Sequence, residues 1–72
     1  MTADPIPLSL LDLVRVREGF DAANALAEAQ AIAAHVDRLG FNRYWVAEHH
    51  NMQSIASAAT SVVLAHAGQH TR

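Results

Sequence analysis

The chain has 72 residues, 51% of them hydrophobic and 17% charged, which fits one small folded domain or part of one and excludes a disordered tail. Its formal net charge is −2 and its five basic residues are scattered, which disfavours nucleic acid and membrane surfaces as partners. It contains no cysteine, which excludes disulfides and thiolate chemistry. Asp4 lies where a signal peptide needs positive charge, and the uncharged stretch 49–71 is too polar to span a bilayer, so we expect a cytoplasmic protein.

The first expected element is a strand over residues 6–14, where apolar residues form a nearly continuous run. Such a run is typical of a parallel strand that is covered on both faces. Pro7 is compatible with this strand because proline is tolerated at a strand's start. Residues 15–20 are then expected to form a loop that contains Gly19.

A helix over residues 22–39 is the strongest signal in the sequence. Asp21 precedes it as an N-cap, since its carboxylate can accept hydrogen bonds from the free N–H groups of the first turn. Gly40 follows at the position that favours a left-handed residue, with Phe41 able to pack back on Val36. At 100° per residue one side of the helix is apolar and mostly alanine, which permits close approach to a sheet. That side consists of Ala22, Ala25, Leu26, Ala29, Ile32, Ala33, Val36 and Leu39.

The second half of the chain repeats the pattern. A strand is expected over residues 43–47, because aromatic and β-branched residues favour extended structure. A second helix is expected over residues 57–67, with Ser54 and Ser57 as alternative N-caps and Gly68 as its stop. Its buried side is expected to contain Ala58, Ala59, Val62, Val63 and Ala65.

The order strand, helix, strand, helix places the chain in the α/β class. A helix that joins two parallel strands crosses over right-handed in nearly all proteins. A (β/α)8 TIM barrel uses about 250 residues for eight strand–helix units, or about 31 residues per unit. Residues 1–72 are therefore expected to form a single partial domain, a β-α-β-α fragment that supplies about two units of such a barrel.

Four segments carry a more specific pattern. The most specific runs from Trp45 to Met52 and reads Trp-Val-Ala-Glu-His-His-Asn-Met. The others are Leu8-Ser9-Leu10-Leu11-Asp12-Leu13, Arg17-Glu18-Gly19 and Ile55-Ala56-Ser57-Ala58-Ala59-Thr60. Together they resemble the amino-terminal segment of the luciferase-like flavin-dependent oxidoreductases, and the resemblance spans nearly the whole chain.

This resemblance implies a (β/α)8 barrel that binds FMN, or the deazaflavin F420 in some branches, commonly as a dimer. It implies hydride transfer or oxygen-dependent monooxygenation of a small organic substrate. His49 matches the family's histidine that lies against the flavin and acts as acid, base or stabiliser of an intermediate. Two departures are visible: Gln53-Ser54 replaces a Pro-Gly-like turn, and the sequence stops at Arg72, where the family's third strand begins. The loops after the seventh and eighth strands, which usually hold phosphate groups in such barrels, are expected to be missing.

The residues themselves support a site at the same place. Glu48 and His49 follow the second expected strand, so they lie at the end of the barrel where such enzymes place their chemistry. An imidazole with a pKa of about 6.5 can give or take a proton at neutral pH, and the Glu48 carboxylate can fix its tautomer. Asp12, at the end of the first strand, either lines the same rim or caps the following loop. The predicted catalytic residues are therefore His49 and Glu48, and the predicted cofactor contacts are His49 and Asp12.

Other interpretations of these residues stay open. His49 could be a strand-end histidine bonded to Glu48 or water, and His50 could orient the loop. A metal site is not expected, because adjacent side chains on an extended segment point to opposite faces and do not converge on one ion. Tyr44 and Trp45 alternate along the strand and are expected to be core and helix contacts rather than groups that stack on a flavin.

Two strands with both helices on one side leave the other side of the sheet and both strand edges exposed. We therefore expect the isolated chain to associate with itself or with a complementary fragment. Two functions are compatible with this expectation. One is a truncated segment of a flavin oxidoreductase that is inactive alone, and the other is a non-catalytic remnant or association module that pairs with another chain.

Overall fold

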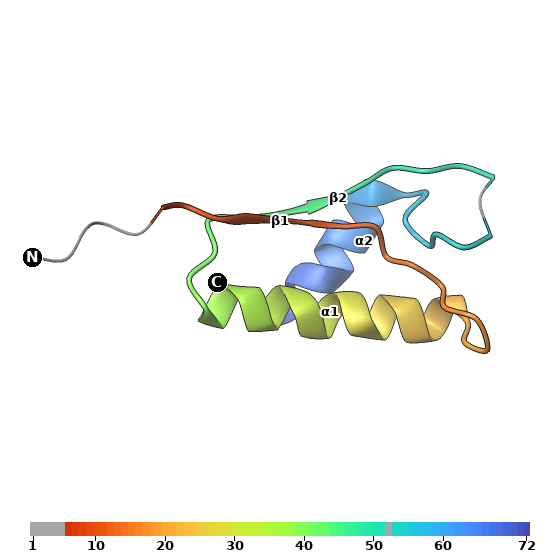
Figure 1. Ribbon diagram of the computed structural model, residues 1–72, viewed down its shortest axis with the longest axis horizontal. Helices are drawn as coiled ribbons and strands as arrows, with labels where there is room; N and C mark the ends of the chain where they lie inside the picture. Colours follow the sequence, from red (N-terminus) through yellow and green to blue (C-terminus); the bar gives the residue numbers. More distant parts are fainter. Residues whose placement is uncertain (1–5, 52) are drawn as a thin grey trace, which may run out of the picture.

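The computed structural model describes residues 6–51 and 53–72, and its elements follow the expected order (Figure 1). They are β1 (Ser9–Asp12), α1 (Ala22–Arg38), β2 (Arg43–Val46), α2 (Thr60–Ala67) and the short 3₁₀ helix η1 (Gly68–His70). β1 and β2 are parallel neighbours, with Ser9 opposite Arg43 and Asp12 opposite Val46. This β-α-β-α arrangement confirms the α/β class and is that of two successive units of a (β/α)8 barrel.

β1 is shorter than the expected strand over residues 6–14, because the backbone turns soon after Asp12. Val14 adopts φ +52°, a left-handed conformation that is rare for a β-branched residue. Its N–H group is held by the Asp12 carboxylate at 2.8 Å. The apolar residues beyond Asp12 therefore belong to the loop that follows β1 rather than to the strand.

α1 begins and ends where its local signals predict. The Asp21 carboxylate accepts the Asn24 N–H at 2.9 Å as an N-cap. At the other end Gly40 adopts φ +81°, and the Phe41 N–H donates to the Val36 carbonyl at 3.0 Å, as in a Schellman motif. Its buried residues are Ala25, Ala29, Ala33, Ala34 and Val36, whereas Ala22, Ile32 and Leu39 are exposed.

α2 begins at Thr60, later than the expected start at residue 57. Ala59 occupies the N-cap position and makes no side-chain hydrogen bond, so neither Ser54 nor Ser57 caps this helix. The later start changes which side is buried: Val63 and Ala67 are buried, whereas the expected Ala58, Ala59, Val62 and Ala65 are exposed. The helix ends before Gly68, as predicted, and the chain continues into η1. Neither α1 nor α2, the helices of the described residues, is both long and apolar enough to cross a membrane.

Both helices lie on the same side of the two-stranded sheet (Figure 1). The core between sheet and helices, against which Val46 packs, contains Val14, Ala25, Ala29 and Val63. Leu11 and Trp45 are paired neighbours on the opposite face, and they are 62% and 56% exposed. Within the part of the chain that the structure describes, one face of the sheet is therefore uncovered, as expected. Trp45 is not the core residue that was predicted, whereas Tyr44, at the alternate position, is half-buried.

Candidate active site

The candidate site lies where the chain leaves the carboxyl ends of β1 and β2 (Figure 1). The loop after β2 turns at Gln53 and Ser54 and then runs antiparallel to the loop after β1. Two backbone hydrogen bonds join the loops, from the Val16 N–H to the Ser54 carbonyl at 2.7 Å and from the Ala56 N–H to the Val14 carbonyl at 2.9 Å. This pairing was not predicted from the sequence, and it fixes the two loops against each other.

Ser57 lies between the loop after β1 and the loop after β2 and contacts both. Its side chain is fully buried, and its hydroxyl lies 2.5 Å from the Ala47 carbonyl and 3.4 Å from the Leu13 carbonyl. Its own carbonyl accepts the His49 N–H at 3.4 Å. A hydroxyl carries one proton, so it donates mainly to Ala47, the closer acceptor. The sequence suggested a helix cap here, and no local pattern indicated a contact with Leu13.

His49 follows β2 closely, as predicted, and is half-buried. Its main chain is held by Ser57, and its Nδ1 atom is buried with no hydrogen-bond partner among the described residues. Buried polar atoms in native proteins nearly always have a partner, and the exceptions call for a specific explanation such as a catalytic role or an unseen ligand. The main chain of His49 is therefore held by a hydrogen bond, whereas the ring nitrogen Nδ1 makes none within the described residues.

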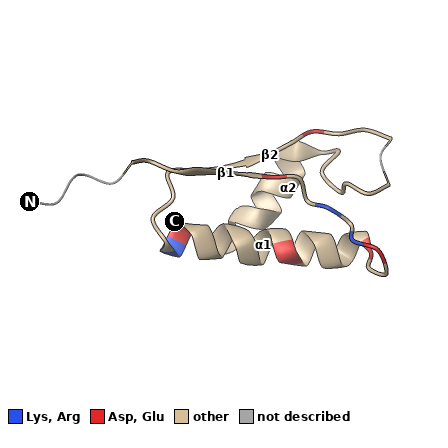
Figure 2. Ribbon diagram, viewed as in Figure 1, with Lys and Arg blue, Asp and Glu red and all other residues tan. Residues whose placement is uncertain are grey.

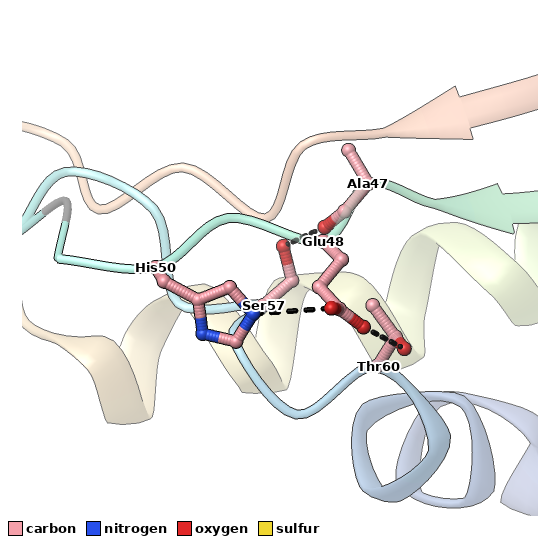
Figure 3. A network of polar contacts seen from close by, with 5 residues as sticks. All are labelled: Ala47, Glu48, His50, Ser57 and Thr60. Carbon is pink, nitrogen blue, oxygen red and sulfur yellow. Dashed lines mark hydrogen bonds and ion pairs between the residues drawn. The ribbon is translucent and has the colours of Figure 1, made fainter.

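The Glu48 carboxylate does not orient His49, contrary to expectation. Its Oε2 atom accepts a hydrogen bond from His50 Nε2 at 3.0 Å, and its Oε1 atom accepts one from the Thr60 hydroxyl at 3.0 Å (Figure 3). The hydrogen bonds from His50 and Thr60, together with the charge of His50, lower the pKa of Glu48 below its usual value. The physical reason is the extended backbone, which sends the side chains of adjacent residues to opposite sides and those two apart to the same side.

Both carboxylate oxygens of Asp12 accept hydrogen bonds from other residues of the chain. Oδ1 accepts the Val14 N–H at 2.8 Å, and Oδ2 accepts the Tyr44 hydroxyl at 2.5 Å. This geometry supports the loop-capping interpretation of Asp12. The contact with Tyr44 was not predicted, although both residues lie on half-buried positions of neighbouring strands.

The Tyr44–Asp12 contact predicts a loss of stability at alkaline pH. Burial, and then the hydrogen bond to Asp12, raise the pKa of Tyr44 well above its ordinary value of 10.0. The unfolded chain therefore loses this proton first, so the stabilisation is complete below pH 10 and is lost as the pH rises above it. The chain has one tyrosine, no cysteine and no lysine, so no other side chain titrates in this range.

Thermal unfolding followed by circular dichroism should show a Tm that falls above about pH 10. Tyr44→Phe should remove most of this fall while leaving arginine and carboxylate effects unchanged. An equal alkaline fall in Tyr44→Phe would contradict the prediction.

Basic residues lie in the loop after β1, beside the candidate site (Figure 2). Arg17 forms an ion pair with Glu28, and its guanidinium lies 4.8 Å from the centre of the Phe20 ring. Arg15 and Arg17 line an open depression of about 450 Å³ next to Ser54. Glu18 lines the same depression, and Arg15 has no ion-pair partner within the described residues.

His66 joins the two α-helices. The His66 ring lies 3.0 Å from the Leu26 carbonyl, and the Gln30 amide donates to the His66 carbonyl at 3.2 Å. These contacts join α2 to α1. Within residues 6–51 and 53–72, no three His, Asp or Glu side chains come together as possible metal ligands.

Comparison with known proteins gives consistent matches across most of the chain. Residues 6–72 match the luciferase-like monooxygenase family. The chain is 45% identical over 71 residues to a luciferase-like monooxygenase of Escherichia coli (strain K12), and 40% identical over 67 residues to the N-acetyl-S-alkylcysteine monooxygenase of Bacillus subtilis (strain 168). These matches cover 99% and 93% of this chain but 21% and 20% of the two relatives. The crystal structure of apo-MsnO8 is similar with a TM-score of 0.88 at 34% identity, over 94% of this chain and 21% of that one.

Two parallel strand–helix units are consistent with a segment of a (β/α)8 barrel. Since the family match covers nearly all of its residues, the chain belongs to the luciferase-like monooxygenase family. The resemblance carried by Trp45–Met52 is thereby confirmed. The chain spans about a fifth of the length of the relatives that it matches.

Proposed function

We propose that this chain forms the His49-bearing part of a flavin-dependent oxidoreductase that oxidises a small organic substrate. The observation that carries the proposal is His49 itself, a half-buried imidazole at the carboxyl ends of two parallel strands with an unsatisfied Nδ1. Barrel enzymes place their reacting groups at this end. Membership of the luciferase-like monooxygenase family supports the same function.

The proposed role of His49 is to hold or move a proton at its imidazole ring. Nδ1 has no hydrogen-bond partner among the described residues, so the ring keeps a nitrogen with hydrogen-bonding capacity for a bound molecule. Imidazole side chains act as general acids, general bases and proton shuttles in enzymes. FMN, or F420, would supply the redox step when bound, and the chain would supply position and proton transfer.

The two predicted cofactor contacts differ in how well they fit a flavin. His49 fits, because its ring has an unsatisfied nitrogen beside the strand ends. Asp12 fits poorly, because Val14 and Tyr44 occupy its oxygens. Phosphate groups in such barrels are usually held by loops after the seventh and eighth strands, and the described residues form two strands. We therefore expect the chain to be inactive alone and to need the remaining barrel units.

A graft tests this function directly. The matched segment of the Bacillus subtilis N-acetyl-S-alkylcysteine monooxygenase, 20% of that protein, would be replaced by the aligned residues of this chain. We expect the purified graft to carry flavin, seen by its visible absorbance, and to oxidise N-acetyl-S-alkylcysteine. The unaltered host is the control for both measurements. A folded graft without flavin and without activity would overturn the proposal.

The uncovered sheet face supports a further part of the proposal, which is self-association of the isolated chain. Leu11 and Trp45 are each more than half exposed on this face, and within the described residues the outer edges of β1 and β2 are unpaired. Soluble proteins seldom leave such surfaces bare, because apolar area and unpaired strand edges both favour association.

A further inference from the structure

We propose that Ser57 is a positioning residue for His49: its hydroxyl and its carbonyl together set where the His49 imidazole lies. The inference deepens the proposed function, since it concerns the same histidine. It begins from the burial of Ser57, whose side chain is fully buried although its residue type is usually exposed. A buried hydroxyl must be hydrogen-bonded to avoid a desolvation cost, and the structure provides it with two carbonyl acceptors.

The two contacts of Ser57 with the His49 segment lie on either side of Glu48. The hydroxyl donates to the carbonyl of Ala47, and the Ser57 carbonyl accepts the N–H of His49 at 3.4 Å. In extended backbone the carbonyl of one residue and the N–H group two residues on point to the same side. Ser57 thus forms hydrogen bonds with the main chain at both ends of the segment 47–49. These two bonds fix the backbone of His49 and, through it, the direction of the His49 side chain.

A third, longer contact reaches the loop after β1, where the Ser57 hydroxyl lies 3.4 Å from the Leu13 carbonyl. Glu48, in the same segment, is held by His50 and Thr60 (Figure 3). These contacts do not include the His49 ring, whose Nδ1 has no partner among the described residues. The position of the His49 ring is therefore set by the backbone of residues 47–49, and the hydrogen bonds of Ser57 hold that backbone.

The test uses nuclear magnetic resonance on the complete 72-residue chain, with Ser57→Ala as the main variant. We expect the His49 ring signals and the midpoint of their pH titration to shift, and the His49 amide to exchange about fivefold faster, as for the loss of one hydrogen bond. The ring signals of His35, which is exposed on α1, should stay unchanged. Ser61→Ala, an exposed serine of α2, is the matched control and should change neither histidine.

Ser57→Thr keeps the hydroxyl and should restore the His49 signals and titration midpoint close to those of the unaltered chain. If circular dichroism shows that Ser57→Ala is unfolded, Ser57→Cys replaces it, because it keeps the volume and offers only a weak donor. An unchanged His49 ring signal and titration midpoint in the folded variant would overturn the proposal. The outcome is separable from the proposed function, since an active graft that lacks His49 would refute the catalytic role and leave the Ser57–His49 contact standing.

Discussion

Replacing His49 by alanine in the graft is expected to lower the rate of substrate oxidation by about 10²–10⁴-fold, the usual contribution of a positioned acid or base. The side chain is half-buried and its backbone is held by Ser57, so its removal leaves the loop contacts in place. Flavin content should change little, because the loops that usually bind phosphate in such barrels belong to the host. The loss should therefore appear in the rate at saturating substrate rather than in the amount of bound flavin.

Two matched variants separate this effect from a general loss of histidine. His35→Ala, on the exposed side of α1, should leave the rate unchanged. His50→Ala removes one partner of Glu48, while Thr60 still holds the carboxylate, so it should have a smaller effect than His49→Ala. A His49→Ala graft that keeps the full rate would show that this histidine is not catalytic.

Trp45→Lys is expected to weaken self-association of the isolated chain by at least about 30-fold. Trp45 is 56% exposed on the sheet face that no helix covers, beside Leu11. A buried tryptophan at the centre of an interface contributes about 2 kcal/mol or more, which is about 30-fold in the dissociation constant. Lysine at this position would also place a charge in the interface, which is costly unless it is paired.

Sedimentation over a range of chain concentrations measures this change. Val62→Lys is the control, since Val62 is 67% exposed but lies on α2, away from the sheet. It should leave the association constant unchanged. If the unaltered chain sediments as a monomer at all concentrations, or if both lysine variants behave alike, the uncovered sheet face is not the contact surface.

The parts of the fold that could be predicted are those encoded by residues close together in the sequence. Asp21 caps α1 through an N–H three residues away, and Gly40 ends it through hydrogen bonds that span a single turn. The alanine-rich side of α1 and the β-branched and aromatic residues of β2 are equally local signals. They placed α1 and β2 correctly within about one residue at each end.

The errors arise where distant residues decide the structure. The residues around Ser57 in the sequence predict a helix cap. Its hydroxyl instead contacts the carbonyls of Leu13 and Ala47, which are 44 and 10 residues away. The end of β1 depends on the left-handed turn at Val14, which apolar composition does not reveal. Tryptophan is a residue type typical of a protein core. Trp45 is exposed because no other element packs on that face of the described sheet.

Sequence predicts that His49 follows the second strand closely, and in the structure it lies shortly after β2; its catalytic role stays a prediction. The contacts of Glu48 could not be predicted in the same way. Its carboxylate contacts His50 and Thr60 rather than His49, because extended backbone sends the side chains of adjacent residues to opposite sides.

The antiparallel contact between the two loops has a consequence for how the protein acquires its structure. Residues 13–16 and 54–57 meet only after α1 and β2 have brought them together, and closing so long a loop costs entropy that short helical contacts do not. On the ribosome, the first of these segments emerges well before the second, and α1 can form in the interval. The corner that holds His49 therefore forms through long-range contacts rather than through local structure alone.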